Sequence, residues 1–499
     1  MTAESQQPSL RLRQSAVRSG IATGLSALAV SGSAAIAGAY LAHKFGRNAE
    51  TDGFLAAYSV YLVLVLAAQA FRLVFVPDLT RASEAGTLAS EFASYAAAML
   101  AVAVPVSVLA GVFSDQLGDL LTGHLPPESA AIASRALVWV VPAAFGQMLA
   151  ALGASALAAE DSYVLAAAAY ALGAIAGLVV FVALAGSHGL ISLGWGLALN
   201  AALAAGIPLV ALVRSGRLVG RGREGLDVLR RISKLAQAAA LPVAMQGVYL
   251  VALRGASGLG EGNQTSLTYA YLFAATLVAS TASSLSLISS APLTRRGLDA
   301  EGAAAHVIHA AWLSLVLIGG AAGVFAIVGG RVVGFVLGSA YTGNVGAQLG
   351  HLVIYLSPWM VAAVAFTVTF PLIFVLERPR VLVPLAIGVL VLDVPLSFAL
   401  RSAFGLPGLA LAMGIATLVG VLALLAVVSQ RLLVATTVGL VRTSLIVGAL
   451  TVASFGLPAI VLSGFAAAAA GVVLYVAAIL LLRPRGLVDA WHYVRALHH

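Results

Sequence analysis

The chain has 499 residues, of which 61% are hydrophobic and 9% are charged, and its mean hydropathy is +1.02. So few charges cannot cover the surface of a soluble protein of this length, so the composition excludes a soluble domain. Cysteine is absent, which excludes disulfide scaffolds and thiolate metal centres. The net charge is +8, but the basic residues lie in short segments between apolar runs, where positive charge orients membrane proteins. This charge therefore does not point to a nucleic-acid partner.

Apolar runs of about 20 residues, each long enough to cross a bilayer, recur along the whole chain. We therefore predict an all-α polytopic membrane protein with about 14 transmembrane helices. The first run, at 23 residues, is longer than the apolar part of a cleaved signal peptide, so we interpret it as a helix. The predicted spans are 20–42, 54–76, 92–113, 136–158, 163–185, 190–213, 237–253, 268–291, 304–329, 350–376, 381–400, 406–429, 443–460 and 464–482.

The basic residues outside these spans predict the orientation of the chain. An even number of spans places both termini on one side, and twenty basic residues fall on that side. The other side has six, which are Lys44, Arg47, Arg135, Arg254, Arg331 and Arg401. Because cytoplasmic loops are richer in arginine and lysine, both termini are predicted to be cytoplasmic.

The sequence matches itself at an offset of about 216 residues. "FVPDLTR" (75–81) corresponds to "APLTRR" (291–296), and the matched positions are Pro77 with Pro292, Glu160 with Glu377, and Gly189 with Gly405. Six spans per repeat is an even number, so the two repeats have the same orientation. We predict two parallel six-helix repeats that form two lobes around a central cavity, plus two C-terminal helices.

This repeat divides the chain into four predicted regions. Residues 1–213 form the N-terminal lobe, 214–236 a basic cytoplasmic linker, 237–430 the C-terminal lobe, and 431–499 two extra helices with a cytoplasmic tail. The linker is interpreted as a solvated, topology-setting segment that lies on anionic headgroups, and the alternative is a specific lipid-phosphate site.

Two stretches resemble a known family. "LAHKFGRNAETDGFLAAY" (41–58) and "AQAFRLVFVPDLTRA" (68–82) are similar to segments of the MurJ (MviN) lipid II flippases, which belong to the multidrug/oligosaccharidyl-lipid/polysaccharide exporter superfamily. The resemblance implies a multi-pass protein of the bacterial cytoplasmic membrane that serves peptidoglycan synthesis. Such a protein is no enzyme and has no cofactor. It acts as a monomer, and its partners are membrane lipids and a lipid-linked oligosaccharide.

The activity that the resemblance implies is transport by alternating access. A polyprenyl-diphosphate-linked saccharide, either lipid II or a related lipid-linked glycan, would move from the cytoplasmic to the outer leaflet. The sequence departs from the family in the first helix, where the flippases carry arginines that face the cavity. Here that region offers Ser31, Ala37 and Gly38, and the second helix reads "YSVYLVLVL" (58–66) where the family tends to have two arginines.

Arginines at the ends of two spans are the candidate substrate-binding residues. An ionisable side chain within hydrocarbon is costly and is a functional candidate by default. Arg72 lies about one turn from the cytoplasmic end of the second span, where its guanidinium could either hold a diphosphate by paired hydrogen bonds or snorkel to the headgroups. Arg254, at the end of the seventh span, is either a second substrate contact or an interfacial anchor.

Asp393 is the candidate cation-coupling residue, deep in the eleventh span. Pro395 removes a backbone hydrogen bond nearby, and Ser397 lies one turn away, so these oxygens could hold Na⁺ or a proton. The resemblance implies a sodium site between the seventh and eleventh helices, and Gln246 is a polar candidate from the seventh. Two alternatives remain open, an ion pair between Asp393 and Arg401 and a neutral buried acid.

Three other functions are considered. The runner-up is a cation-coupled multidrug antiporter of the same superfamily, which twelve helices would suffice to build. A polyprenyl-dependent glycosyltransferase is a third candidate, because Glu50 and Asp52 mimic the paired acids of such enzymes, although Asp52 also fits a helix cap. The fourth is a scaffold that has lost transport.

Overall fold

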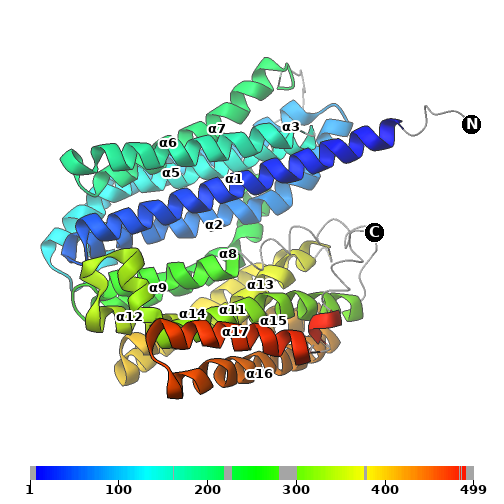
Figure 1. The fold of residues 1–499 in the computed structure, drawn as a ribbon. Coiled ribbons are helices and arrows are strands. Elements are labelled where there is room, and N and C mark those ends of the chain that lie inside the picture. Colours follow the sequence, from blue (N-terminus) through cyan, green and yellow to red (C-terminus); the bar gives the residue numbers. More distant parts are fainter. Residues whose placement is uncertain are drawn as a thin grey trace, which may run out of the picture. The chain divides into compact units, whose positions relative to one another are not determined.

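The computed structural model describes residues 7–160, 162–218, 227–279, 300–375, 379–482, 484 and 486–489 (Figure 1). These residues form helices, and no strand occurs among them. The chain divides into two compact units, Met1–Val243 and Ala244–His499, and the division falls inside helix α8.

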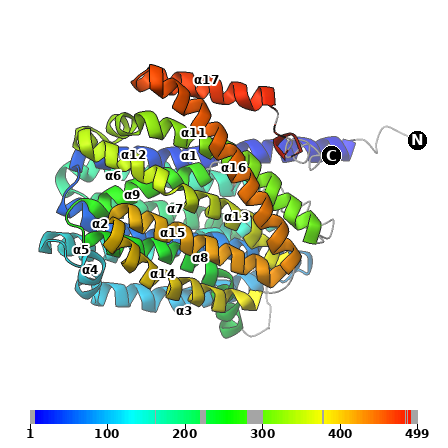
Figure 2. The ribbon, with the colours of Figure 1, turned by 90° about the horizontal axis from the view of Figure 1, so that it is seen from below.

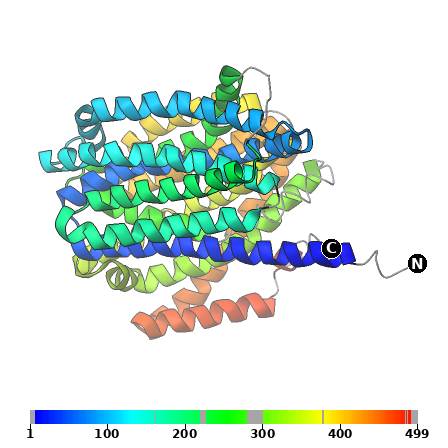
Figure 3. The same ribbon diagram turned by 90° about the horizontal axis from the view of Figure 1, so that it is seen from above.

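Helix α5 lies at the centre of the first unit and packs against α2, α3, α4 and α7. Helix α1 runs along α6 (Figures 1 and 3), where the Ser26 hydroxyl donates a hydrogen bond of 2.6 Å to the carbonyl oxygen of Ala167. The helices of this unit are α1 (Gln7–Phe45), α2 (Ala49–Glu84), α3 (Leu88–Val112), α4 (Ser114–Thr122), α5 (Pro127–Ala159), α6 (Tyr163–His188), α7 (Ile191–Arg214) and the first half of α8 (Val228–Ser257).

Helices α6 and α7 approach each other so closely that their backbones touch. A Cβ added at Gly177 would meet the carbonyl oxygen of Gly196, and one added at Gly196 would meet that of Gly177. Small residues allow this approach, which supplies packing energy between helices in a bilayer, where apolar burial contributes little.

Replacing Gly196 by valine is expected to destabilise the first unit by about 3 kcal/mol, the upper end of the usual cost of overpacking, because both contacts are with backbone. Gly206→Val is the matched control, since Gly206 lies on the same helix with open space around its Cβ position. The midpoint of thermal unfolding in detergent measures both. Equal midpoints for the two variants would show that the close approach contributes nothing.

The second unit contains the remaining helices. Helix α11 packs against α12, α16 and α17, while α15 lies between α13 and α14 (Figure 2). These helices are α9 (Asn263–Val278), α11 (Ala300–Leu337), α12 (Gly343–Tyr355), α13 (Ser357–Val375), α14 (Leu382–Phe404), α15 (Leu406–Val428), α16 (Gln430–Val461) and α17 (Gly464–Leu482), with short 3₁₀ turns at Ser339–Tyr341 and Pro379–Val381.

The predicted fold class is confirmed. Among the described residues, 12 helices are long and apolar enough to cross a membrane, and the bent pair α12 and α13 makes a thirteenth candidate. The span predicted at 268–291 coincides with α9 in its first half, and its second half lies outside the described residues.

Three local expectations are corrected. The span predicted at 350–376 begins at Gly343 and is broken at Leu356, where α12 and α13 meet at 43°. The break precedes Pro358, which has no backbone N–H to continue a helix but fits a first turn. The short helix α4 was not predicted, and the N-cap of α2 is Asn48 rather than Asp52, because the helix begins earlier than the apolar run.

The repeat is visible in one of its matched pairs. Gly189 ends α6 with a φ of 61° and Gly405 ends α14 with a φ of 63°, a left-handed conformation that favours glycine. Each is followed within two residues by the next helix. Pro292 and Glu377 lie outside the described residues, so the pairs that contain them stay predictions.

Candidate functional site

Asp393 lies on the inward face of α14 and is completely buried. The buried positions of this helix recur every three or four residues, whereas Val391 and Val394 point outward and are 67% and 55% exposed. One stripe therefore faces the interior of the second unit, and the outward face is apolar as well, which is the pattern of a membrane-spanning helix. Its members are Leu382, Ala386, Val389, Asp393 and Ser397.

Only one oxygen of the Asp393 carboxylate is satisfied by the described residues. The Ser397 hydroxyl donates a hydrogen bond of 3.2 Å to Oδ1, and Oδ2 is buried with no hydrogen-bond partner there. A buried carboxylate oxygen without a partner is costly and indicates a proton or a ligand. No ion pair joins Asp393 to Arg401 in the described part of the chain, and the Arg401 guanidinium lies against Gly258 instead.

Thr417 of α15 lies at the level of Asp393. Gly420 packs on Val389 and Gly408 packs on Leu400, so α14 and α15 are antiparallel with a register that sets Asp393 opposite residues 415 and 416, next to Thr417. The Thr417 hydroxyl is buried and, like Asp393 Oδ2, has no partner among the described residues. The sequence analysis missed this residue.

Gln246 belongs to a different polar cluster, between α8 and α9. Its Oε1 accepts a hydrogen bond of 2.8 Å from the Tyr271 hydroxyl, and the Tyr271 ring stacks on Tyr249 at 4.1 Å. The Tyr249 hydroxyl donates to Thr268 Oγ1 at 2.9 Å. The hydrogen bonds of the described residues thus join Gln246 to α9 and Asp393 to Ser397, with none between the two.

No cluster of three or more histidine, aspartate or glutamate side chains lies close enough to hold a metal ion within the described ranges. A cation at Asp393 would therefore meet one carboxylate and neutral hydroxyl oxygens. This donor set fits a singly charged ion better than a divalent one, which usually takes several carboxylates.

Arg72 is exposed on α2, in the first unit, and lies near one tyrosine of α6. Its guanidinium lies near enough to the Tyr170 hydroxyl of α6 to interact electrostatically, and Tyr170 interacts in the same way with Tyr61. Tyr61 stacks on Tyr58 with 5.5 Å between ring centroids. Guanidinium and phenol groups both donate hydrogen bonds, so this region suits a ligand rich in acceptor oxygens.

Arg254 is engaged at the end of its own helix. Its Nη1 donates to Ser257 Oγ at 2.9 Å, and that hydroxyl donates to the Arg254 carbonyl oxygen at 2.7 Å. Both residues lie in the last turn of α8. This local arrangement favours the interfacial anchor over a second substrate contact.

The last part of the predicted linker forms the first turns of α8, and two of its basic residues pair with carboxylates of the first unit, which corrects the interpretation of this part as solvated. Arg231 pairs with Glu91 at 2.5 Å, and its guanidinium lies 4.7 Å from the centre of the Tyr95 ring. Lys234 pairs at 2.5 Å with Asp78, which also accepts a hydrogen bond from the Tyr95 hydroxyl. Residues 219–226 of the segment lie outside the described residues.

Arg217 anchors the other end of this segment. Its guanidinium lies 3.0 Å from Glu160, which also accepts a hydrogen bond of 2.5 Å from the Ser83 hydroxyl. The sequence match between Glu160 and Glu377 did not predict the ion pair of Glu160 with Arg217. Hydropathy does not show which charged side chains meet in the fold.

Several solved structures with the same fold are transporters. The lipid II flippase MurJ in an inward closed conformation matches with a TM-score of 0.71 and 17% identity, covering 97% of this chain and 100% of the other. An inward-facing multidrug resistance MATE transporter of the MOP superfamily matches at 0.60 and 15%, covering 85% and 94%. A MOP superfamily transporter from Pyrococcus furiosus matches at 0.56 and 16%, covering 86% and 95%.

At these identities the structural matches show the fold alone. A comparison with curated protein sequences gives no match. The family model described as lipid II flippase MurJ matches residues 41–482, which include every transmembrane helix except part of the first. The chain therefore belongs to the MurJ lipid II flippase family.

Proposed function

We propose that the protein moves a polyprenyl-diphosphate-linked saccharide from the cytoplasmic to the outer leaflet by alternating access, as a monomer with both termini in the cytoplasm. The family match over residues 41–482 carries this proposal. The family is one of transporters, so the chain is no enzyme, and the glycosyltransferase alternative is excluded.

In this proposal Arg72 contacts the diphosphate of the substrate. The membrane-crossing part of α1, Gly24–Phe45, has no arginine where the family resemblance leads one to expect them, so another basic residue has to contact the substrate. Arg72 is exposed, and the Tyr170 hydroxyl adds a second donor beside it. Arg254 stays a weaker candidate because Ser257 already engages its guanidinium.

Coupling to a cation gradient is proposed for Asp393. The Asp393 carboxylate and the hydroxyls of Ser397 and Thr417 would bind Na⁺. If the coupling ion is H⁺, the carboxylate would be protonated instead. The bound cation would neutralise a charge that is otherwise buried in a low-dielectric interior. Gln246 would act indirectly, through the packing of α8 and α9.

Transport in proteoliposomes tests the proposal against the drug-antiporter alternative, which the shared MATE fold keeps open. We expect vesicles that contain the protein to move a fluorescent lipid-linked saccharide to the opposite leaflet at least about tenfold faster than empty vesicles. Efflux of a cationic dye without movement of the lipid would instead establish the antiporter. Movement of neither would support the transport-inactive scaffold.

A further inference from the structure

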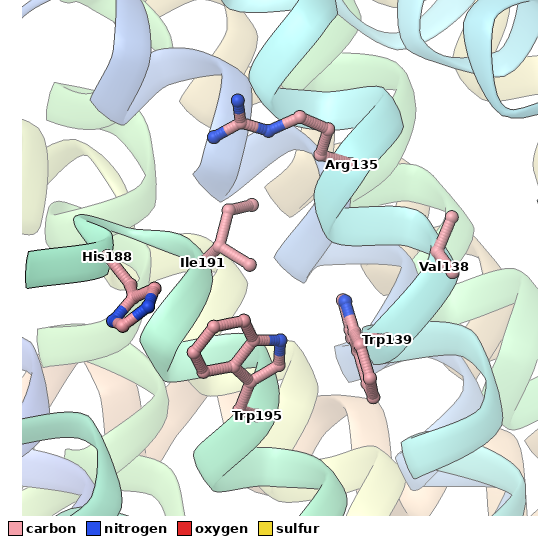
Figure 4. A pocket seen from close by; sticks show the side chains of 6 residues that line it. All are labelled: Arg135, Val138, Trp139, His188, Ile191 and Trp195. Atoms are coloured by element: carbon pink, nitrogen blue, oxygen red, sulfur yellow. The ribbon is translucent and has the colours of Figure 1, made fainter. Parts of the chain in front are cut away.

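A cavity lies in the first unit, at the end of the helices opposite to Arg72. It has a volume of about 390 Å³ and lies among α5, the end of α6 and the start of α7 (Figure 4). Along α6 it is about 27 Å from Tyr170, at 1.5 Å per residue, so it is separate from the proposed substrate site. The lining residues are Arg135, Val138, Trp139, His188, Ile191 and Trp195.

Two glycines shape this cavity. Gly189 adopts a positive φ and turns the chain sharply from α6 to α7, which brings His188 to 4.9 Å from the Trp195 ring. Gly194 leaves room for the Cβ of Trp139 against the backbone of α7. The two indole rings then meet edge to face, with 6.1 Å between their centres.

Two polar groups that line the cavity, on Arg135 and Trp195, are hydrogen-bond donors, and His188 shares a hydrogen bond of 2.8 Å with the Ser187 hydroxyl through Nδ1. In Figure 4 the indole nitrogen of Trp195 faces Trp139 across the opening, and the Arg135 side chain extends above Ile191. The Trp195 Nε1 is buried with no acceptor among the described residues. Arg135 is in no ion pair within the described part of the chain, and no acidic residue lines the cavity. A ligand would have to supply both acceptor oxygens and negative charge.

The place of the cavity indicates where such a ligand comes from. Val138 and Trp139 are 43% and 42% exposed, so the cavity opens to the surface of the unit at the helix ends. Tryptophan is enriched at the depth of lipid headgroups. Arg135 is one of six basic residues on the predicted outer side, where the positive-inside tendency disfavours arginine.

We propose that this cavity binds the phosphate of an anionic phospholipid headgroup. The Arg135 guanidinium provides the charge and the Trp195 N–H provides a directed hydrogen bond, while the exposed apolar surface beside Val138 accommodates the start of an acyl chain. The site is independent of the transported substrate, because it needs only the membrane around the protein.

Native mass spectrometry of the detergent-purified full chain tests the proposal, with phosphatidylglycerol and phosphatidylcholine as probes. Trp195→Phe removes the N–H and keeps an aromatic ring, and Arg135→Gln removes the charge. We expect each to lower the affinity for phosphatidylglycerol by about tenfold, because hydrogen bonds to charged groups are the strong ones. Arg331→Gln is the matched control, since this predicted outer-side arginine belongs to the second unit, where it lies over the Phe465 ring.

Three results would overturn the proposal. The first is equal affinity of both variants and the wild type for phosphatidylglycerol, and the second is equal loss in Arg331→Gln. The third is full displacement of the lipid by millimolar inorganic phosphate, which would assign the site to free phosphate. If Trp195→Phe lowers the yield of folded protein, Arg135→Gln decides alone, because this side chain is exposed.

Discussion

Replacing Asp393 by asparagine is expected to abolish cation-dependent transport while the amount of folded protein stays close to that of the wild type. The amide has nearly the same volume as the carboxylate, and its oxygen can still accept the hydrogen bond that Ser397 donates. The negative charge that attracts a cation, and the oxygen that could hold a proton, are lost. Because Oδ2 has no other partner among the described residues, the fold does not depend on the charge.

The measurement is flipping of a lipid-linked saccharide in proteoliposomes with a Na⁺ gradient, a proton gradient or neither. We expect at least about a tenfold loss of the gradient-dependent rate. Asp115→Asn is the matched control, since this exposed aspartate accepts a similar hydrogen bond from Ser134, at 2.6 Å. Gradient-dependent transport at the wild-type rate in Asp393→Asn would remove the coupling role.

A second large effect is expected for Arg72→Lys, which keeps the positive charge and loses the planar pair of donors. If Arg72 holds a diphosphate, the transport rate should fall by at least about tenfold, because an ammonium group cannot form two parallel hydrogen bonds to the phosphate oxygens. A side chain that only snorkels would tolerate the change, since lysine reaches the headgroups equally well.

Arg81→Lys is the control on the same helix. Arg81 is 73% exposed and pairs with Asp78 at 2.8 Å, so lysine is expected to leave transport unchanged. The comparison uses protein whose thermal unfolding midpoint matches the wild type. Wild-type transport in Arg72→Lys, together with poor folding of Arg72→Ala, would establish the snorkelling role.

The sequence predicts the features of the fold and of the site that a hydropathy pattern or an isolated charge reveals. An aspartate inside a run such as "VLVLDVPLSF" is conspicuous, so Asp393 was found, and Ser397 followed from its spacing. Thr417 gives no comparable signal, because a threonine in an apolar helix can bond to the preceding turn at little cost. Only the register of α14 on α15 places it within two residues of the position opposite the acid.

Contacts between distant parts of the chain could not be predicted from the sequence either. Arg231 and Lys234 reach carboxylates that lie 140 and 156 residues earlier, and no local pattern indicates which of several acids they meet. Tyr170 has no motif around it and acquires its role only because α6 lies near α2. The break at Leu356 was predictable in principle from the proline that follows, but the uninterrupted apolar run concealed it.

The ion pairs at the two ends of the basic segment also determine how the units are connected. Arg217 is held by Glu160 and Arg231 by Glu91, so both ends of the segment are attached to the first unit. The chain enters the second unit at Val243–Ala244, within the continuous helix α8. A helix is much stiffer than a flexible linker. Pro242 lies inside α8 directly before this boundary, and a proline cannot donate the backbone hydrogen bond of a regular helix. The covalent joint between the units is therefore a helix whose backbone hydrogen bonding is interrupted at the junction itself.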